Sequence, residues 1–230
     1  MKIHGLQKMT LLDYPGKVAC TVFFGGCDLR CPFCHNSDLL DMNAPALMDE
    51  NELLSFLKKR QGLLEGVALT GGEPLLRPDL PDLCRRIKEL GYPVKLDTNG
   101  FHPGALKQLI DSGLIDAAAM DVKNSPERYP ATCGREKLDL SALRDSIALL
   151  KEGRIAYEFR TTVIAEFHDD DSFYAIRDMI AGAEKYFLQK FTDRDTVLFA
   201  GLHAPSKEDM LRWADIVRPA VKEVSLRGAD

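Results

Sequence analysis

The chain has 230 residues, of which 45% are hydrophobic and 28% charged, and its formal net charge is −5. This length and apolar content suit one globular domain over residues 1–230, and the net charge gives no electrostatic case for a nucleic-acid partner. No apolar segment is long enough to span a membrane and the first residues lack signal-peptide character, so we expect a cytoplasmic protein with no membrane partner. Six cysteines without a secretory signal argue against a disulfide framework.

Apolar strands alternate with amphipathic helices along most of the chain. A β-ribbon is expected over about residues 3–17, and a helix with a tail over about 205–230, in which 221–226 is one more strand or an ordered end. Short apolar runs predict six strands between these ends, at 18–24, 67–70, 94–98, 117–122, 156–164 and 185–191. Alternation of this kind predicts a parallel sheet, and six units are fewer than the eight of a closed barrel. We therefore expect an α/β fold that forms an open, partial (β/α)6 barrel.

Three cysteines, Cys27, Cys31 and Cys34, follow the first predicted strand in the spacing C-x3-C-x2-C. Zinc in a closed site takes four ligands, but the fourth here would be His35, and adjacent side chains rarely reach the same ion. An iron–sulfur cube is normally held by four thiolates, so three thiolates leave one iron open to a small molecule. The spacing therefore favours a catalytic 4Fe-4S cluster.

Two other patterns fit part of this motif. Cys31 and Cys34 match the C-x-x-C pair of a thiol–disulfide oxidoreductase, and together with His35 they match the C-x-x-C-H haem-attachment pattern. Both alternatives leave Cys27 unexplained. The other three cysteines, Cys20, Cys84 and Cys133, form no second C-x2-C pair and are assigned to structure.

Polar residues follow or lie within the later strands. Because ligand chemistry in parallel α/β folds gathers at the carboxyl ends of the strands, we expect these residues to face one rim. The alternatives are ordinary turns for the glycine and Asp-Thr-Asn motifs, and a buried amide for the glutamine. The residues are Gly71, Gly72 and Glu73 after the second strand, Asp97, Thr98 and Asn99 at the third, Asp121 and Lys123 at the fourth, Arg160 in the fifth and Gln189 in the sixth.

The cysteine motif, with Phe33 before its last cysteine and His35-Asn36 after it, resembles the radical S-adenosylmethionine (SAM) enzymes. The Cys-His-Asn ending and the opening Gly5-Leu6-Gln7-Lys8 and Asp13-Tyr14-Pro15-Gly16-Lys17 are similar to the glycyl-radical-enzyme activases of that superfamily. Among these, the chain most resembles the activating proteins of anaerobic ribonucleoside-triphosphate reductase, over about residues 3–192.

This resemblance implies one 4Fe-4S cluster on the three cysteines, with SAM bound at the open iron. It implies cleavage of SAM to methionine and a 5′-deoxyadenosyl radical, which takes an α-hydrogen from a glycine of a partner enzyme. It assigns the SAM amino group to Gly71, Gly72 and Glu73, and a SAM carboxylate and monovalent-cation site to Asp97, Thr98 and Asp121. We further expect SAM contacts from Phe33, Asn36, Asn99, Lys123, Arg160 and Gln189, with Lys123 and Arg160 also in catalytic positions.

A glycyl-radical enzyme is the expected partner, with a flavodoxin- or ferredoxin-type protein as one-electron reductant. Three alternatives stay open: an activase of a pyruvate formate-lyase-type enzyme, a small-molecule radical enzyme of the 7-carboxy-7-deazaguanine synthase type, and a thiol–disulfide oxidoreductase. His168 and His203 are expected in loops on the active rim, with no role assigned.

Overall fold

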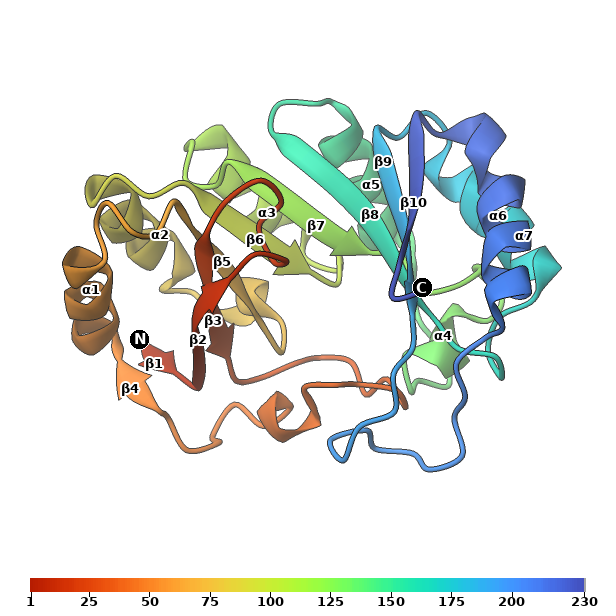
Figure 1. The fold of residues 1–230 in the computed structure, drawn as a ribbon, viewed down its shortest axis with the longest axis horizontal. Helices are drawn as coiled ribbons and strands as arrows, with labels where there is room; N and C mark the ends of the chain where they lie inside the picture. The colour runs from red at the N-terminus through yellow and green to blue at the C-terminus, as the bar shows by residue number, and fades with distance from the viewer. Residues whose placement is uncertain (230) are drawn as a thin grey trace.

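A computed structural model describes residues 1–229, and its centre is an eight-stranded sheet (Figure 1). The order across the sheet is β10-β9-β8-β7-β6-β5-β3-β2, in which β2 runs antiparallel to β3 and all other neighbours run parallel. The strands of this sheet are β2 (Gly5–Thr10), β3 (Ala19–Phe24), β5 (Gly66–Gly71), β6 (Val94–Thr98), β7 (Ala117–Asp121), β8 (Ala156–Val163), β9 (Lys185–Lys190) and β10 (Glu223–Arg227).

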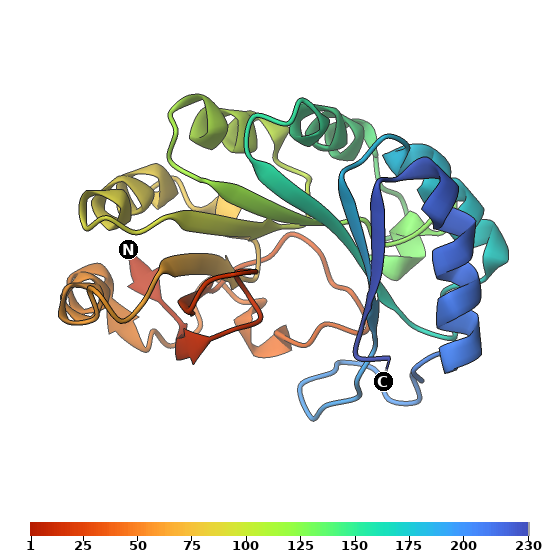
Figure 2. The ribbon, with the colours of Figure 1, turned by 45° about the horizontal axis from the view of Figure 1, so that its top comes forward.

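The sheet curves but does not close, because its edge strands β2 and β10 do not pair with each other (Figure 2). The predicted α/β partial barrel is confirmed. The segment for which the sequence left two options, 221–226, forms most of β10, which pairs with β9. A second, two-stranded sheet joins β1 (Lys2–Ile3) to β4 (Met48–Asp49) near the N-terminus.

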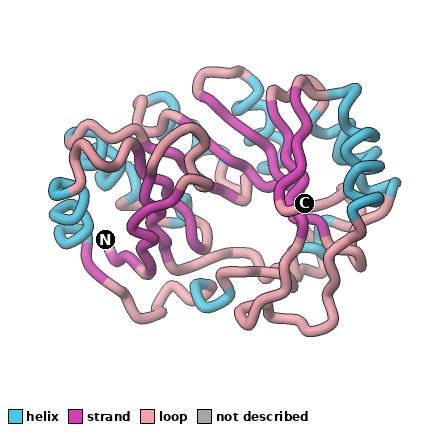
Figure 3. Tube along the Cα trace, viewed as in Figure 1, coloured by secondary structure: helices cyan, strands magenta, loops and turns pink. Residues whose placement is uncertain are grey.

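The helices lie on the outer side of the curved sheet, so the strands form the inner wall of the partial barrel (Figure 3). Asp49 begins α1 with a capping box, because its carboxylate accepts from the Glu52 N–H and the Glu52 carboxylate accepts from the Asp49 N–H. The helices are α1 (Glu50–Lys59), α2 (Leu80–Glu89), α3 (Pro103–Asp111), α5 (Ser141–Lys151), α6 (Asp170–Ile180) and α7 (Lys207–Val217), with a one-turn α4 (Tyr129–Thr132) after β7. In the part of the chain described, 1–229, no helix combines the length and apolar character needed to cross a lipid bilayer.

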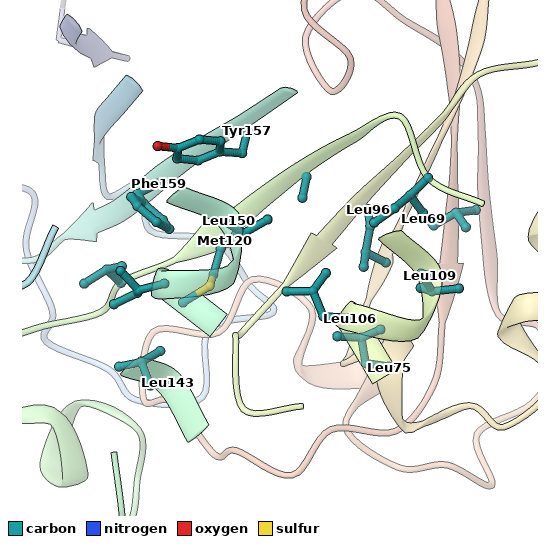
Figure 4. Close-up of a cluster of buried hydrophobic side chains, with 14 of the residues drawn as sticks. Leu69, Leu75, Leu96, Leu106, Leu109, Met120, Leu143, Leu150, Tyr157 and Phe159 are labelled. Carbon is teal, nitrogen blue, oxygen red and sulfur yellow. The ribbon is translucent and has the colours of Figure 1, made fainter. Parts of the chain in front are cut away.

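Neighbouring residues of each strand face opposite sides of the sheet. Leu96, Met120 and Phe159 face outward and pack with side chains of α3 and α5 in a buried apolar layer (Figure 4). The next residue of each strand, Asp97, Asp121 and Arg160, faces the inside of the barrel instead. The fold therefore separates an apolar outer core from a polar inner surface.

The turn between β2 and β3 folds back into the barrel. Tyr14 is buried against Ala19 and Ala117, the first residues of β3 and β7, and so fills the amino-terminal end of the barrel. Asp13 lies inside as well and accepts a hydrogen bond from Thr21 at 2.5 Å. The barrel is therefore filled at one end, and the inner cavity lies towards the carboxyl ends of the strands.

Candidate active site

A cavity of about 550 Å³ lies on the inner face of the barrel. Every site residue predicted from the sequence lines this cavity except Glu73. They are Cys27, Cys31, Phe33, Cys34, Asn36, Gly71, Gly72, Asp97, Thr98, Asn99, Asp121, Lys123, Arg160 and Gln189. The loops and strands that carry them are far apart in the sequence, so the parallel topology brings them to one place.

The loop after β3 carries the three cysteines, and all three reach the same cavity. The backbone orders this loop: the Leu29 N–H donates to the Cys27 sulfur at 3.4 Å, and the Cys34 N–H donates to the Cys31 carbonyl at 3.1 Å. All three are free thiols, and no other cysteine among residues 1–229 lines the cavity.

The three thiols do not form a ready-made site for a single metal ion. Over residues 1–229, no three His, Cys, Asp or Glu side chains come close enough together to hold one metal ion. The zinc alternative, with His35 as fourth ligand, therefore finds no support. His35 stacks on Phe191 and bonds through its Nε2 to the Thr192 carbonyl at 2.7 Å.

The loop after β5 lies directly against the cysteine loop. The Gly72 N–H donates to the Phe24 carbonyl at 2.8 Å, and the Glu73 N–H donates to the Gly26 carbonyl at 2.7 Å. A Cβ on Gly72 would meet that Gly26 oxygen at 2.1 Å, so only glycine permits the approach. The Asn36 amide adds a bond to the Gly71 carbonyl at 3.0 Å. The two glycines are thus held with their backbone facing the cavity.

Glu73 is placed differently from the sequence expectation. Its side chain is fully buried, and its carboxylate accepts hydrogen bonds from the Leu75 N–H at 3.0 Å, the Thr98 hydroxyl at 2.9 Å and the Asn99 N–H at 2.7 Å. Burial raises the pKa of Glu73 to about 7. Its carboxylate does not face the cavity to receive an amino group; it joins the loops that follow β5 and β6.

Charged side chains from β6, β7 and β8 form a network on the cavity floor. Arg160 bonds to Asp97 at 3.0 Å and to Asp121 at 3.1 Å, Lys123 bonds to Asp121 at 3.1 Å, and Lys95 bonds to Asp97. Burial alone would raise the pKa of both aspartates, but the neighbouring cations lower the pKa of each. Of these groups, Asp97, Asp121, Lys123 and Arg160 line the cavity, so two cations there balance two carboxylates.

Asp97, Thr98 and Asp121, the residues expected to form a monovalent-cation site, lie together on the cavity. Both carboxylates have protein cations as partners, and the Thr98 hydroxyl donates to Glu73. The cation site stays a prediction. Lys95 was not predicted because it lies in an otherwise apolar strand, where only its pairing with Asp97 shows its role.

Three of the residues expected to contact SAM are held in place by neighbouring protein groups. Phe33 is buried and packs against Phe167 with ring centroids 6.1 Å apart. The Asn99 amide donates to Asp28 at 2.8 Å, and Gln189 lies 3.5 Å from the Thr162 hydroxyl. These groups are thus anchored at the cavity wall by protein partners.

The two histidines expected on the active rim do not line the cavity. His168 is buried and bonds to the Lys123 carbonyl at 2.9 Å, whereas His203 is exposed and pairs with Glu166 at 2.6 Å. The sequence reasoning also missed cavity residues on β2, the β2–β3 turn, β3 and the loop after β9. They include Gln7, Thr10, Leu12, Asp13, Thr21 and Arg194, of which only Gln7 and Asp13 fell in segments that the resemblance had marked.

An open α/β barrel with three cysteines and a glycine loop on one cavity defines a class of iron–sulfur enzymes. The chain belongs to the radical SAM superfamily, whose sequence profile matches residues 21–179. It is therefore a radical SAM enzyme, and the family implies a 4Fe-4S cluster and SAM. The residues present fit these groups, because three thiols, and no fourth among residues 1–229, face a cavity that Lys123 and Arg160 also line.

Two named proteins are similar to this chain in sequence. The chain is 28% identical to a protein of Methanocaldococcus jannaschii that is named as a candidate glycyl-radical enzyme activating enzyme, over 98% of this chain and 95% of the relative. It is 33% identical to the pyruvate formate-lyase-activating enzyme of Clostridium pasteurianum over 142 residues, which cover 59% of this chain and 58% of that enzyme.

Solved structures support the fold. SuiB of Streptococcus suis, bound to its precursor peptide SuiA, matches 90% of this chain and 48% of its own with a TM-score of 0.70 at 15% identity. A domain of the pyruvate-formate lyase-activating enzyme of Bacteroides vulgatus matches 71% of this chain and 99% of its own with a TM-score of 0.59 at 19% identity. At these identities the likeness concerns the fold alone.

Proposed function

We propose that this protein is an activase that removes an α-hydrogen from a glycine of a partner glycyl-radical enzyme, and that the partner is anaerobic ribonucleoside-triphosphate reductase. The observation that carries the proposal is the meeting of the three-thiol loop and the Gly71-Gly72 loop on one cavity of an open barrel. Similarity over nearly the whole length to the M. jannaschii relative supports activation of a glycyl-radical enzyme. The choice of reductase rests on the resemblance of the opening segment.

In this proposal Cys27, Cys31 and Cys34 would hold the cluster, and the cavity that they line would hold SAM beside it. The bound cluster and SAM together supply a reductive cleavage that yields a 5′-deoxyadenosyl radical. A flavodoxin- or ferredoxin-type protein is the proposed source of the electron.

The chain's own residues bind and orient SAM. The Gly71-Gly72 backbone, which packs against Gly26 and lines the cavity, is the proposed contact for the SAM ammonium. Lys123 and Arg160, which line the cavity, are the proposed cationic contacts for the SAM carboxylate. Phe33, Asn36, Asn99 and Gln189 are the proposed contacts to the rest of the molecule.

The open side of the barrel favours a macromolecular substrate. The edge strands β2 and β10 leave this side unpaired, and Leu12, which borders the cavity, is 83% exposed. A glycine in a loop of a folded protein needs such an opening to reach the cavity. A small-molecule radical enzyme gains more from a closed site that excludes water.

The proposal is tested with anaerobically reconstituted protein, dithionite and SAM. We expect 5′-deoxyadenosine from the wild type and from Cys84→Ala, a buried cysteine of α2, and none from Cys27→Ala. Mixing with anaerobic ribonucleotide reductase should then give a glycyl-radical doublet in electron paramagnetic resonance (EPR). A doublet only with pyruvate formate-lyase would change the partner, and a Cys27→Ala variant with full dithiol–disulfide activity would support the oxidoreductase alternative.

A further inference from the structure

Asp28, the residue after the first cysteine of the motif, ties the cysteine loop to the loop after β6. Its Oδ1 accepts a hydrogen bond from the Asn99 side-chain amide at 2.8 Å, and its Oδ2 accepts one from Nε2 of His102 at 3.0 Å. His102 is the residue before α3, so it stands on the firm start of a helix. The side chains of Asp28 and His102 are only 30% and 26% exposed. Both oxygens of this carboxylate are therefore held by one short segment, 99–102.

Asn99 continues this connection to the Gly71-Gly72 loop. Its backbone N–H donates to the carboxylate of Glu73 at 2.7 Å, and its side-chain oxygen accepts from the Phe101 N–H at 3.0 Å. The Asn99 side chain is thus fixed at both its oxygen and its nitrogen. A continuous chain of hydrogen bonds therefore runs from the end of the glycine loop, through Asn99, to the cysteine loop.

The chain of hydrogen bonds lies behind the cavity wall. Cys27, Gly72 and Asn99 line the cavity, whereas Asp28 and His102 do not. A ligand that contacts the cysteine loop and the glycine loop at once needs a fixed separation between them, because a small misplacement of either loop weakens its contacts. The bonds of Asp28 keep that separation without themselves reaching the ligand.

We propose that Asp28 is a positioning residue, whose hydrogen bonds from Asn99 and His102 fix the cysteine loop relative to the loops that bind SAM. The inference rests on the SAM binding proposed above and not on the identity of the partner enzyme. Hydrogen bonds behind a metal site that orient its ligands typically matter by about tenfold to a hundredfold. Backbone bonds such as that from the Glu73 N–H to the Gly26 carbonyl also hold these loops, so we expect the lower end of this range.

The experiment is calorimetric binding of SAM to anaerobically reconstituted protein. Asp28→Ala removes the acceptor of both bonds and should weaken SAM binding about tenfold. His102→Ala leaves the bond from Asn99 and should weaken SAM binding about threefold. Asp28→Asn keeps the shape: its amide oxygen can accept from Asn99 and its amide nitrogen can donate to a neutral His102, so its affinity should lie within about twofold of the wild type. Asp38→Ala, at an exposed carboxylate shortly after the motif, is the matched control and should bind SAM as the wild type does.

EPR of the reduced cluster gives a second measurement that a purely structural role would not change. At one limiting SAM concentration, the spectral change produced by SAM should be complete in the wild type and Asp28→Asn and partial in Asp28→Ala. Iron content and circular dichroism accompany it, and we expect the wild-type iron content in every folded variant, because Asp28 does not line the cavity. If Asp28→Ala does not fold, His102→Ala and Asp28→Asn provide the comparison.

Three results would overturn the proposal. The first is equal SAM affinity in the wild type, Asp28→Ala and His102→Ala. The second is an Asp28→Asn variant as weak as Asp28→Ala, since the carboxylate would then act through its charge. The third is loss of iron from folded Asp28→Ala and His102→Ala, which would assign the pair to cluster assembly. Failure of the wild type itself to bind SAM would instead overturn the proposed function, and this inference with it.

Discussion

The site holds buried carboxylates in two regions, and the protein accommodates them in opposite ways. Asp97 and Asp121, at the ends of β6 and β7, are paired with Arg160, Lys95 and Lys123, and their pKa values are lowered. Glu73, after β5, has only neutral donors within hydrogen-bonding distance, and burial raises its pKa to about 7.

The difference shows what each region contributes. A buried carboxylate stays ionised when a cation compensates for lost hydration, whereas neutral donors compensate only in part. The aspartate network therefore provides a charged floor for a ligand. Glu73 instead acts as a brace that holds the glycine loop against the loop after β6.

The largest effect is expected from removing the central cation. Arg160→Met would leave Asp97 and Asp121, which are partly buried, with one lysine partner each, and we expect a loss of about 3 kcal/mol in the free energy of unfolding of the cluster-free protein. Urea denaturation measures this loss. The control is Arg128→Ala, which breaks a half-exposed pair with Asp169 and should cost less than about 1 kcal/mol. Equal losses in the two variants would contradict the role given to the network.

The pH dependence of stability separates the two regions. With its pKa raised to about 7, Glu73 keeps its proton to higher pH in the folded protein than in the unfolded chain. Stability of the wild type relative to Glu73→Gln should therefore fall as pH rises from about 4.5 to about 7, by up to about 3 kcal/mol.

Asp97 should behave in the opposite way. Because its pKa is lowered, the stability it contributes is present above the ordinary aspartate pKa and is lost as pH falls through the folded value. Denaturation across pH, with Asp97→Asn as the companion variant, measures both slopes. Slopes of the same sign for the two variants would remove the contrast between the regions.

A smaller effect is expected from crowding the glycine loop. Gly72→Ala places a methyl group against the Gly26 carbonyl, so we expect a loss of about 2 kcal/mol and weaker SAM binding. Gly104→Ala in α3 is the matched control, because a Cβ there meets nothing within 4 Å. It should be neutral or stabilising by up to about 1 kcal/mol. Calorimetric binding of SAM to reconstituted protein, with thermal melts, checks both variants.

The smallest effect concerns the tie between the cysteine and glycine loops. Asn36→Ala removes the bond from its amide to the Gly71 carbonyl, which should cost about 1 kcal/mol. Asn43→Ala, at an exposed residue whose side chain faces solvent, should change the stability by less than about 0.5 kcal/mol. If the two variants melt alike, the tie does not contribute to stability.

Patterns within short stretches were enough to predict most of the architecture. The six parallel strands follow from apolar runs. The helices α1, α6 and α7 begin after Asp49, Asp169 and Ser206, whose side-chain oxygens each accept a hydrogen bond from the backbone N–H three residues later. The cysteine motif likewise predicted one thiol-lined loop from spacing alone.

The sequence by itself determined the order of the elements and which polar residues follow each strand, because helix and strand periods and cap residues act over a few neighbouring positions. Only the tertiary structure decided the partner of each buried charge, because Glu73, Asp97 and Arg160 come from different strands and meet neighbours far along the chain. It also decided that the segment after β7 lies against the cysteine loop, where the Arg30 N–H donates to the Cys133 carbonyl. Local pattern thus predicted most of the polar residues that follow the strands and line the cavity, and packing in three dimensions decided which partners they have.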